Sequence, residues 1–168
     1  MMGNATDVDG NALSLPGIAE NTATTTGRLA LVNPNFVAPD LGRFLLGWCD
    51  GMSKISDRSE KRDAFQGFVM AVRANPSSLQ QTGADMIEVV TSILFAIMSW
   101  HIPHNEIPSN ILSGPYRFEP FPSEFSDLLA SLQQLLRDIK TSSGPAWAQI
   151  EGQMPTNVKQ LMSDVYQL

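Results

Sequence analysis

The stretch DRSEKRDAFQGFVMAVRANP, residues 57–76, carries the signals of one complete α-helix. Asp57 is a good N-cap residue and Glu60 follows three positions later, which is the spacing of a capping box. Apolar residues then recur every three or four positions, the period of a single helix face: Ala64, Phe65, Phe68, Val69 and Val72. Because the residue before a proline avoids the α region, this helix should end at Asn75-Pro76. The sequence therefore predicts an amphipathic helix with one buried side.

Further helices are predicted on both sides of this stretch. Residues 20–32 contain no proline and end at Asn33-Pro34, which predicts a helix despite four threonines. An apolar stripe with helical spacing predicts a second helix over residues 41–55. Residues 83–100 are apolar on most sides, which is typical of a helix buried between neighbours.

The C-terminal third contains a proline-rich break and then more helix. Residues 102–122 hold five prolines and three aromatic residues, which predicts a long loop. Ser123 can cap a helix with a leucine stripe, a short helical piece surrounds residues 147–151, and Pro155 opens a last helix. No segment alternates with period two over a convincing length, so the predicted fold class is all-α.

The ends of two predicted helices repeat. The segment from Gly27 to Pro34 recurs loosely from Gly67 to Pro76, and Asn75 follows Asn33 by 42 residues. A helix-pair repeat of ~40–47 residues is the period of HEAT and armadillo arrays, although an irregular helical bundle is the alternative. We therefore expect a right-handed α-solenoid of antiparallel helix pairs, with residues 1–16 as a flexible leader and residues 17–168 as the repeats. The expected pairs cover residues 20–55, 57–101 and 124–168, with the loop at 102–122 between the last two.

The composition excludes several classes of protein. The formal net charge of −6 disfavours a nucleic-acid partner, because such a surface repels phosphate backbones. The most apolar stretch, residues 86–102, contains Glu88 and falls short of the ~18–20 apolar residues of a membrane span. The opening residues MMGNATD lack the basic and apolar regions of a signal peptide. With one cysteine, the chain has no internal disulfide framework.

Several segments resemble the C-terminal part of the transportin family of nuclear import receptors, also called karyopherin-β2 or importin subunit β-2. The similar segments include ENTATTTGRL at 20–29, AFQG at 64–67, VRANPS at 72–77, Ser-Trp at 99–100 and VYQL at 165–168. The resemblance covers roughly residues 17–103 and 124–168. It marks the chain as the C-terminal end of a longer array.

The resemblance implies a HEAT array that carries cargo proteins through nuclear pores and is found in the cytoplasm and the nucleus. In that family the partners are cargo proteins with nuclear localisation signals, some with a Pro-Tyr ending, and the GTPase Ran. Most of the family's cargo and Ran contacts lie upstream of this segment, so no cargo-binding residue is assigned here. We expect a protein-binding fragment that is not an enzyme and holds no cofactor.

Candidate catalytic and metal residues are few. His101, His104 and Glu106 could suggest a metal site, but a zinc site needs three or four rigidly held ligands, so solvated turn residues are the better interpretation. A small helical hydrolase that uses Cys49, or the two histidines His101 and His104, is the alternative function. Cys49 follows Trp48 on an apolar helix, where cysteine usually acts as a small hydrophobe. We therefore expect neither a metal nor a catalytic residue.

Three surface features remain. The helix after Asp57 has a basic side, for which we expect a solvated face, made of Arg58, Lys61, Arg62 and Arg73. The aromatic residues of the 102–122 loop are either a docking strip for a partner or anchors that pin the loop: Tyr116, Phe118 and Phe121. The first helix lacks an upstream neighbour, so we expect it to expose an apolar face, and we expect self-association or poor stability of the isolated chain. A helical scaffold with an unrelated partner is a further alternative.

Overall fold

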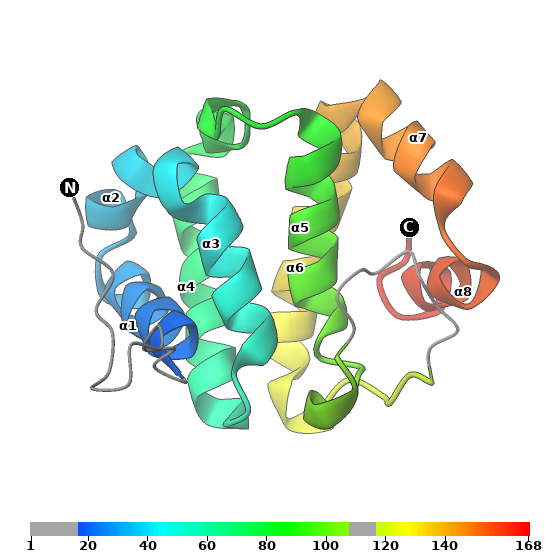
Figure 1. Ribbon diagram of the computed structural model, residues 1–168, viewed down its shortest axis with the longest axis horizontal. Helices are drawn as coiled ribbons and strands as arrows, with labels where there is room; N and C mark the ends of the chain where they lie inside the picture. The colour runs from blue at the N-terminus through cyan, green and yellow to red at the C-terminus, as the bar shows by residue number, and fades with distance from the viewer. Residues whose placement is uncertain (1–16, 108–116) are drawn as a thin grey trace, which may run out of the picture.

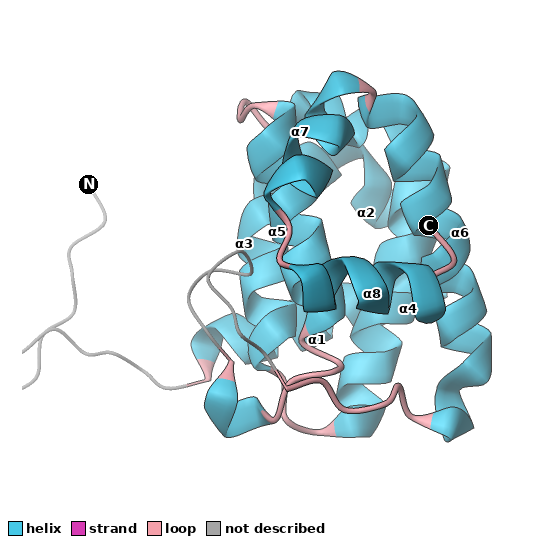
Figure 2. Cartoon of the chain, turned by 90° about the vertical axis from the view of Figure 1, so that its right-hand side faces the viewer, coloured by secondary structure: helices cyan, strands magenta, loops and turns pink. Residues whose placement is uncertain are grey.

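The computed structural model describes residues 17–107 and 117–168, and this part of the chain consists of helices and loops without a strand (Figures 1 and 2). The all-α prediction is confirmed. The α-helices are α1 (Ile18–Val32), α2 (Pro34–Val37), α3 (Leu41–Lys54), α4 (Arg58–Ala74), α5 (Met86–Met98), α6 (Ser126–Ser143), α7 (Pro145–Gln153) and α8 (Thr156–Asp164). Short 3₁₀ turns connect them: η1 (Ala38–Asp40), η2 (Pro76–Gln81), η3 (His104–Glu106) and η4 (Ser123–Phe125).

The long helices stack in two layers. In one layer α1 packs on α4 and α4 packs on α6, and in the other α3 packs on α5 and α5 packs on α7. The layers also contact each other, α1 against α3 at one end and α6 against α7 at the other (Figure 1). Each helix pair thus covers the apolar side of the next pair, which is how an α-solenoid buries a continuous core.

The local signals of residues 57–76 act as predicted. The Asp57 carboxylate accepts a hydrogen bond of 2.8 Å from the backbone N–H of Glu60, and α4 ends before Asn75-Pro76. Asp85 caps α5 in the same way with the N–H of Glu88, so α5 starts at Met86, after Gly83. The expected capping role of Ser123 is wrong, because Ser123 lies in the η4 turn and α6 begins three residues later.

Glycines allow α1 and α4 to cross at very short distance. A Cβ atom built on Gly67 would lie 1.9 Å from the carbonyl oxygen of Gly27, and one built on Gly27 would lie 2.3 Å from the Cα of Ala64. Real carbon–oxygen contacts between backbones are ~3.3 Å or longer. Only a residue without a side chain fits at either position, which gives a physical reason for the glycine that opens both copies of the repeat.

Aromatic side chains fill the space between the layers. The Trp48 indole N–H donates a 3.0 Å hydrogen bond to the carbonyl of Ala23, and its ring meets the edge of Phe68 with centroids 5.3 Å apart. Beyond α5, the Trp100 ring lies between Phe65 and Phe121, at 5.5 and 5.2 Å. Phe121 therefore attaches the described end of the proline-rich segment to the core.

Some expectations fall outside the described residues, namely the flexible leader at 1–16 and the 108–116 part of the loop, which includes Tyr116. Among the helices that the structure describes, none is long and apolar enough to cross a membrane.

Candidate functional site

An apolar surface lies at the α1–α2 end of the stack. The large hydrophobic side chains that are exposed in the described part of the chain are Ile18, Leu29 and Val32 of α1 and Phe36 of α2. Val32 is 85% exposed and Phe36 is 67% exposed. Residues 18, 29 and 32 share one side of α1, because they are 11 and 14 positions apart in a helix of 3.6 residues per turn. We call these four residues the end face; the exposed apolar face expected on the first helix is present.

A groove lies between the surfaces of α1 and α3, next to the end face. Its cavity volume is about 480 Å³, and small side chains from α1 form one wall while aromatic rings from α3 form the other: Ala19, Thr22, Ala23, Thr26, Phe44 and Trp48, with Arg43 and Gly47. Thr22 of the groove lies one turn from Ile18 of the end face, on the exposed side of α1. The groove and the end face therefore form one apolar surface with a threonine rim.

His101 is buried, so its interpretation as a solvated turn residue is wrong. It is 0% exposed, and its ring nitrogens lie 2.7 Å from the carbonyl oxygen of Glu119 and 2.8 Å from the hydroxyl oxygen of Tyr166. Burial lowers the pKa of His101, an effect that the charge of Lys61 reinforces and the Glu119 carbonyl opposes. The ring is then neutral, and because a carbonyl only accepts, Nδ1–H donates to Glu119 and Nε2 accepts from the Tyr166 hydroxyl.

This hydrogen-bonded cluster has a structural consequence. Tyr166 follows α8 and Glu119 precedes α6, so His101 ties both segments to the end of α5. The Tyr166 pKa is raised by burial, which keeps the phenol protonated as the donor that the neutral imidazole requires. His104, in contrast, is exposed as expected for a turn residue. The described residues contain no group of three or more His, Cys, Asp or Glu side chains that could hold a metal ion.

Cys49 does not have the environment of a nucleophile. The side chain is buried in α3, and burial, with a smaller contribution from Asp50, raises the pKa of the thiol to about 12. A nucleophilic cysteine needs a lowered pKa and access to substrate. Both ring nitrogens of His101 are already hydrogen-bonded, one to the Glu119 carbonyl and one to the Tyr166 hydroxyl. The His101 imidazole is therefore not free to act as a base for the Cys49 thiol.

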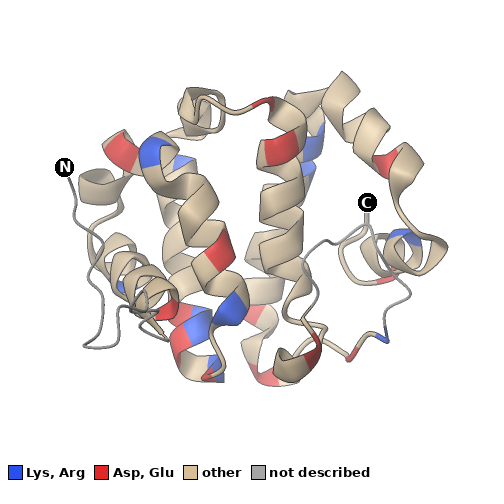
Figure 3. Ribbon diagram, viewed as in Figure 1, with Lys and Arg blue, Asp and Glu red and all other residues tan. Residues whose placement is uncertain are grey.

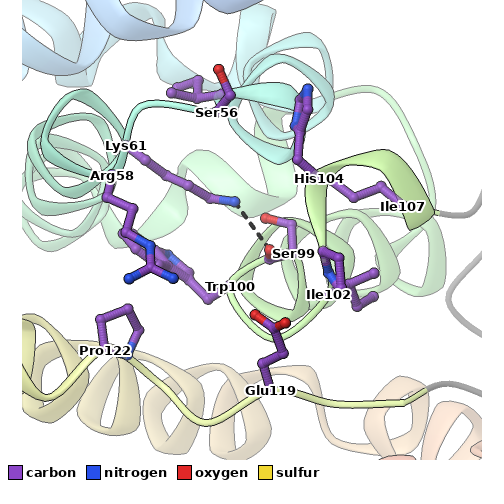
Figure 4. A pocket seen from close by; sticks show the side chains of 12 residues that line it. Ser56, Arg58, Lys61, Ser99, Trp100, Ile102, His104, Ile107, Glu119 and Pro122 are labelled. Atoms are coloured by element: carbon purple, nitrogen blue, oxygen red, sulfur yellow. Dashed lines mark hydrogen bonds between the residues drawn. The ribbon is translucent and has the colours of Figure 1, made fainter.

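Lys61 is buried as well, which corrects its assignment to a solvated basic face. It is 6% exposed; its Nζ donates a 3.1 Å hydrogen bond to the carbonyl of Ser99 and lies 5.1 Å from the centre of the Trp100 ring. Burial lowers the pKa of Lys61 from 10.5 to about 7. The side chain lines a pocket of about 190 Å³ between the start of α4 and the segment after α5 (Figure 4).

The other basic residues of α4 behave as expected. Arg58 and Arg73 are exposed, and Arg62 is half-buried and pairs with Asp63 at 3.0 Å. Arg28 of α1 also reaches this region and lies 3.4 Å from Glu60. Figure 3 shows basic and acidic positions close together near the start of α4.

The burial of His101 and Lys61 was not predicted from the sequence. His101 meets Tyr166 across 65 positions and Lys61 meets Ser99 across 38 positions, and neither partner is visible in a local pattern. The available signals are weak: Lys61 lies three positions before Ala64 and four before Phe65 of the predicted stripe, and His101 directly follows Trp100 at the end of an apolar helix.

Comparison with known proteins shows several relatives, which are named Transportin, Transportin-1 or Importin subunit beta-2. The chain is 29% identical over 152 residues to a Transportin of Dictyostelium discoideum, which covers 90% of this chain and 13% of that protein. It is 42% identical over 102 residues to Transportin-1 of Oryza sativa (58% and 10%), and 39% identical over 62 residues to Importin subunit beta-2 of Schizosaccharomyces pombe (37% and 7%). No family model matches. The chain thus spans about a tenth of the length of these relatives.

Proposed function

We propose that this chain, a relative of the C-terminal segment of the transportins, is a protein-binding part of a nuclear import receptor. The observation that carries the proposal is the similarity to transportins of distant organisms, which extends over 90% of the chain in one of them. Its partners would be cargo proteins with nuclear localisation signals and Ran, which bind the family mainly through upstream repeats. The protein would then occur in both cytoplasm and nucleus.

The stacked helix layers support a recognitional role. An α-solenoid offers long surfaces to partners. The buried Cys49 and the fully bonded His101 argue against a hydrolase that uses these two residues. The end face and the adjoining groove supply the apolar contact area that protein partners use.

We also propose that the isolated chain associates with a second copy through the end face. Leu29 and Val32 lie one turn apart, and Phe36 follows on α2, so the three side chains offer one continuous apolar strip to a partner. Burying such a strip from water stabilises association by ~25 cal/mol per Å² of apolar area, before the cost of lost rotational and translational freedom.

A chimera tests the receptor function. The matching 102-residue region of the rice Transportin-1 would be replaced by that of this chain, and import of a fluorescent cargo with a Pro-Tyr signal would be measured in permeabilised cells. We expect import at a rate comparable to that of the parent receptor. A chimera that folds, as judged by circular dichroism, but carries no cargo into nuclei would contradict the proposal. The matched control carries Gly67→Val, which should disrupt the α1–α4 crossing and reduce import.

A further inference from the structure

The pocket around Lys61 contains hydrogen-bond donors without acceptors. An ammonium group carries three donors, and the described residues provide one acceptor for Lys61, the Ser99 carbonyl at 3.1 Å. The indole N–H of Trp100, another lining residue, is buried and has no hydrogen-bond partner among the described residues. Each buried donor without an acceptor costs about 1–3 kcal/mol, so a ligand that supplies acceptor oxygens to these groups would recover part of that free energy.

The side chains that line the pocket include two basic residues, Arg58 and Lys61, and one acidic residue, Glu119. Within the described residues no carboxylate forms an ion pair with Lys61, and Arg58 on the same side reaches Glu124 only at 3.9 Å. Figure 4 shows Arg58, Lys61 and Trp100 along one side of the pocket, and Ile102, His104 and Ile107 along the other. Glu119 is the one acidic side chain among the lining residues, and it is exposed.

The size of the pocket limits what it can hold. A volume of about 190 Å³ corresponds to roughly six water molecules at ~30 Å³ each, whereas pockets for drug-sized ligands are ~300–1,000 Å³. One tetrahedral oxyanion with part of its hydration shell fits this space, and a nucleotide does not.

We propose that this pocket is a binding site for a single phosphate-like oxyanion, held by Lys61 and Arg58. The ligand would be either a free inorganic ion or a phosphoserine side chain of a partner peptide. Its oxygens supply the acceptors that the Lys61 ammonium lacks, and its charge compensates the cation that burial otherwise disfavours. This site is independent of the receptor function and would exist whether or not the chain takes part in import.

The protonation of Lys61 gives the site a pH dependence. Burial lowers the pKa of the Lys61 amine to about 7. An anion binds to the charged amine, so above pH 7 the amine takes up a proton when the anion binds. The other charged or titratable groups around it are Arg58 from α4 and His101, His104 and Glu119 from the segment after α5. Binding of sulfate, whose own charge is constant in this range, should weaken by at least about tenfold between pH 6.5 and 8.5.

The test follows the Trp100 indole N–H resonance by NMR while inorganic sulfate replaces chloride at constant ionic strength. We expect a saturable shift in the parent and in the Arg73→Met control, which removes an exposed cation of the same helix. Lys61→Met should abolish the shift, and Glu119→Gln should strengthen binding by removing the acidic neighbour. A phosphoserine peptide and its serine counterpart form a second arm, in which tighter binding of the phosphopeptide than of sulfate indicates a peptide-borne ligand.

Three results would overturn the site. They are a linear shift without saturation in the parent, an equal saturable shift in Lys61→Met, and an affinity for sulfate that is the same at pH 6.5 and 8.5. If Lys61→Met does not fold, the Glu119→Gln variant still tests the proposal. Sulfate binding by Glu119→Gln that is unchanged or weaker than in the parent would contradict the site.

Discussion

Replacing Gly67 with alanine should destabilise the protein, although alanine is the better helix former. In an open helix position the exchange stabilises by about 1 kcal/mol. At Gly67 the new Cβ would lie 1.9 Å from the Gly27 carbonyl oxygen, where ~3.3 Å is needed, so α1 and α4 must separate by more than about 1 Å. Overpacking in a tight core costs about 1–3 kcal/mol and more where the obstacle is backbone. The net loss should be about 2 kcal/mol.

Urea denaturation followed by circular dichroism measures this change. Gly152→Ala is the matched control, because a Cβ atom at this α7 position meets nothing within 4 Å and should stabilise by about 0.5–1 kcal/mol. The double exchange Gly27→Ala with Gly67→Ala should cost less than the sum of the single exchanges, since both crowd the same crossing and one separation of α1 from α4 accommodates both. A Gly67→Ala variant as stable as the parent would refute the close-crossing argument.

Three further outcomes follow from the buried polar groups. Tyr166→Phe should cost about 1–3 kcal/mol of unfolding free energy, because His101 loses its hydroxyl donor; unchanged stability in urea would count against the cluster. The free energy of unfolding should rise with pH between 7 and 9 by up to about 1.4 kcal/mol per unit, because the unfolded chain keeps Lys61 protonated to its ordinary pKa of 10.5 while the folded chain releases the proton near 7. Lys61→Met should remove that slope, and a slope that persists would show another cause. Native Cys49 should resist iodoacetamide at pH 8 and react once urea unfolds the chain, since burial raises its pKa to about 12; rapid labelling of the native protein would contradict this.

The helices were predictable where their signals are local. Asp57 and the Asn75-Pro76 pair bound α4 through contacts within a few residues, and the structure places the helix between them. The prediction that Ser123 caps α6 was wrong because the chain first makes a 3₁₀ turn at Ser123. The sequence signal for a cap does not distinguish such a turn from the start of an α-helix.

The polar interior was not predictable for a different reason. The burial of Lys61 and His101 depends on which helices stack, and their partners lie far away in the sequence. A lysine among arginines and a histidine beside prolines look like surface residues until the fold is known. The repeated glycines were visible in the sequence, but their contact at the α1–α4 crossing is a property of the packing alone.

The protein-binding role predicts that the end face of the isolated chain binds a second copy, and sedimentation velocity of the purified chain over a wide concentration range tests this most directly. We predict a concentration-dependent increase in mass for the parent, and a monomer for a variant with Leu29→Glu and Phe36→Glu, whose side chains are exposed and whose exchange should leave the core intact. A parent that stays monomeric throughout, or a variant that associates equally, would contradict the account.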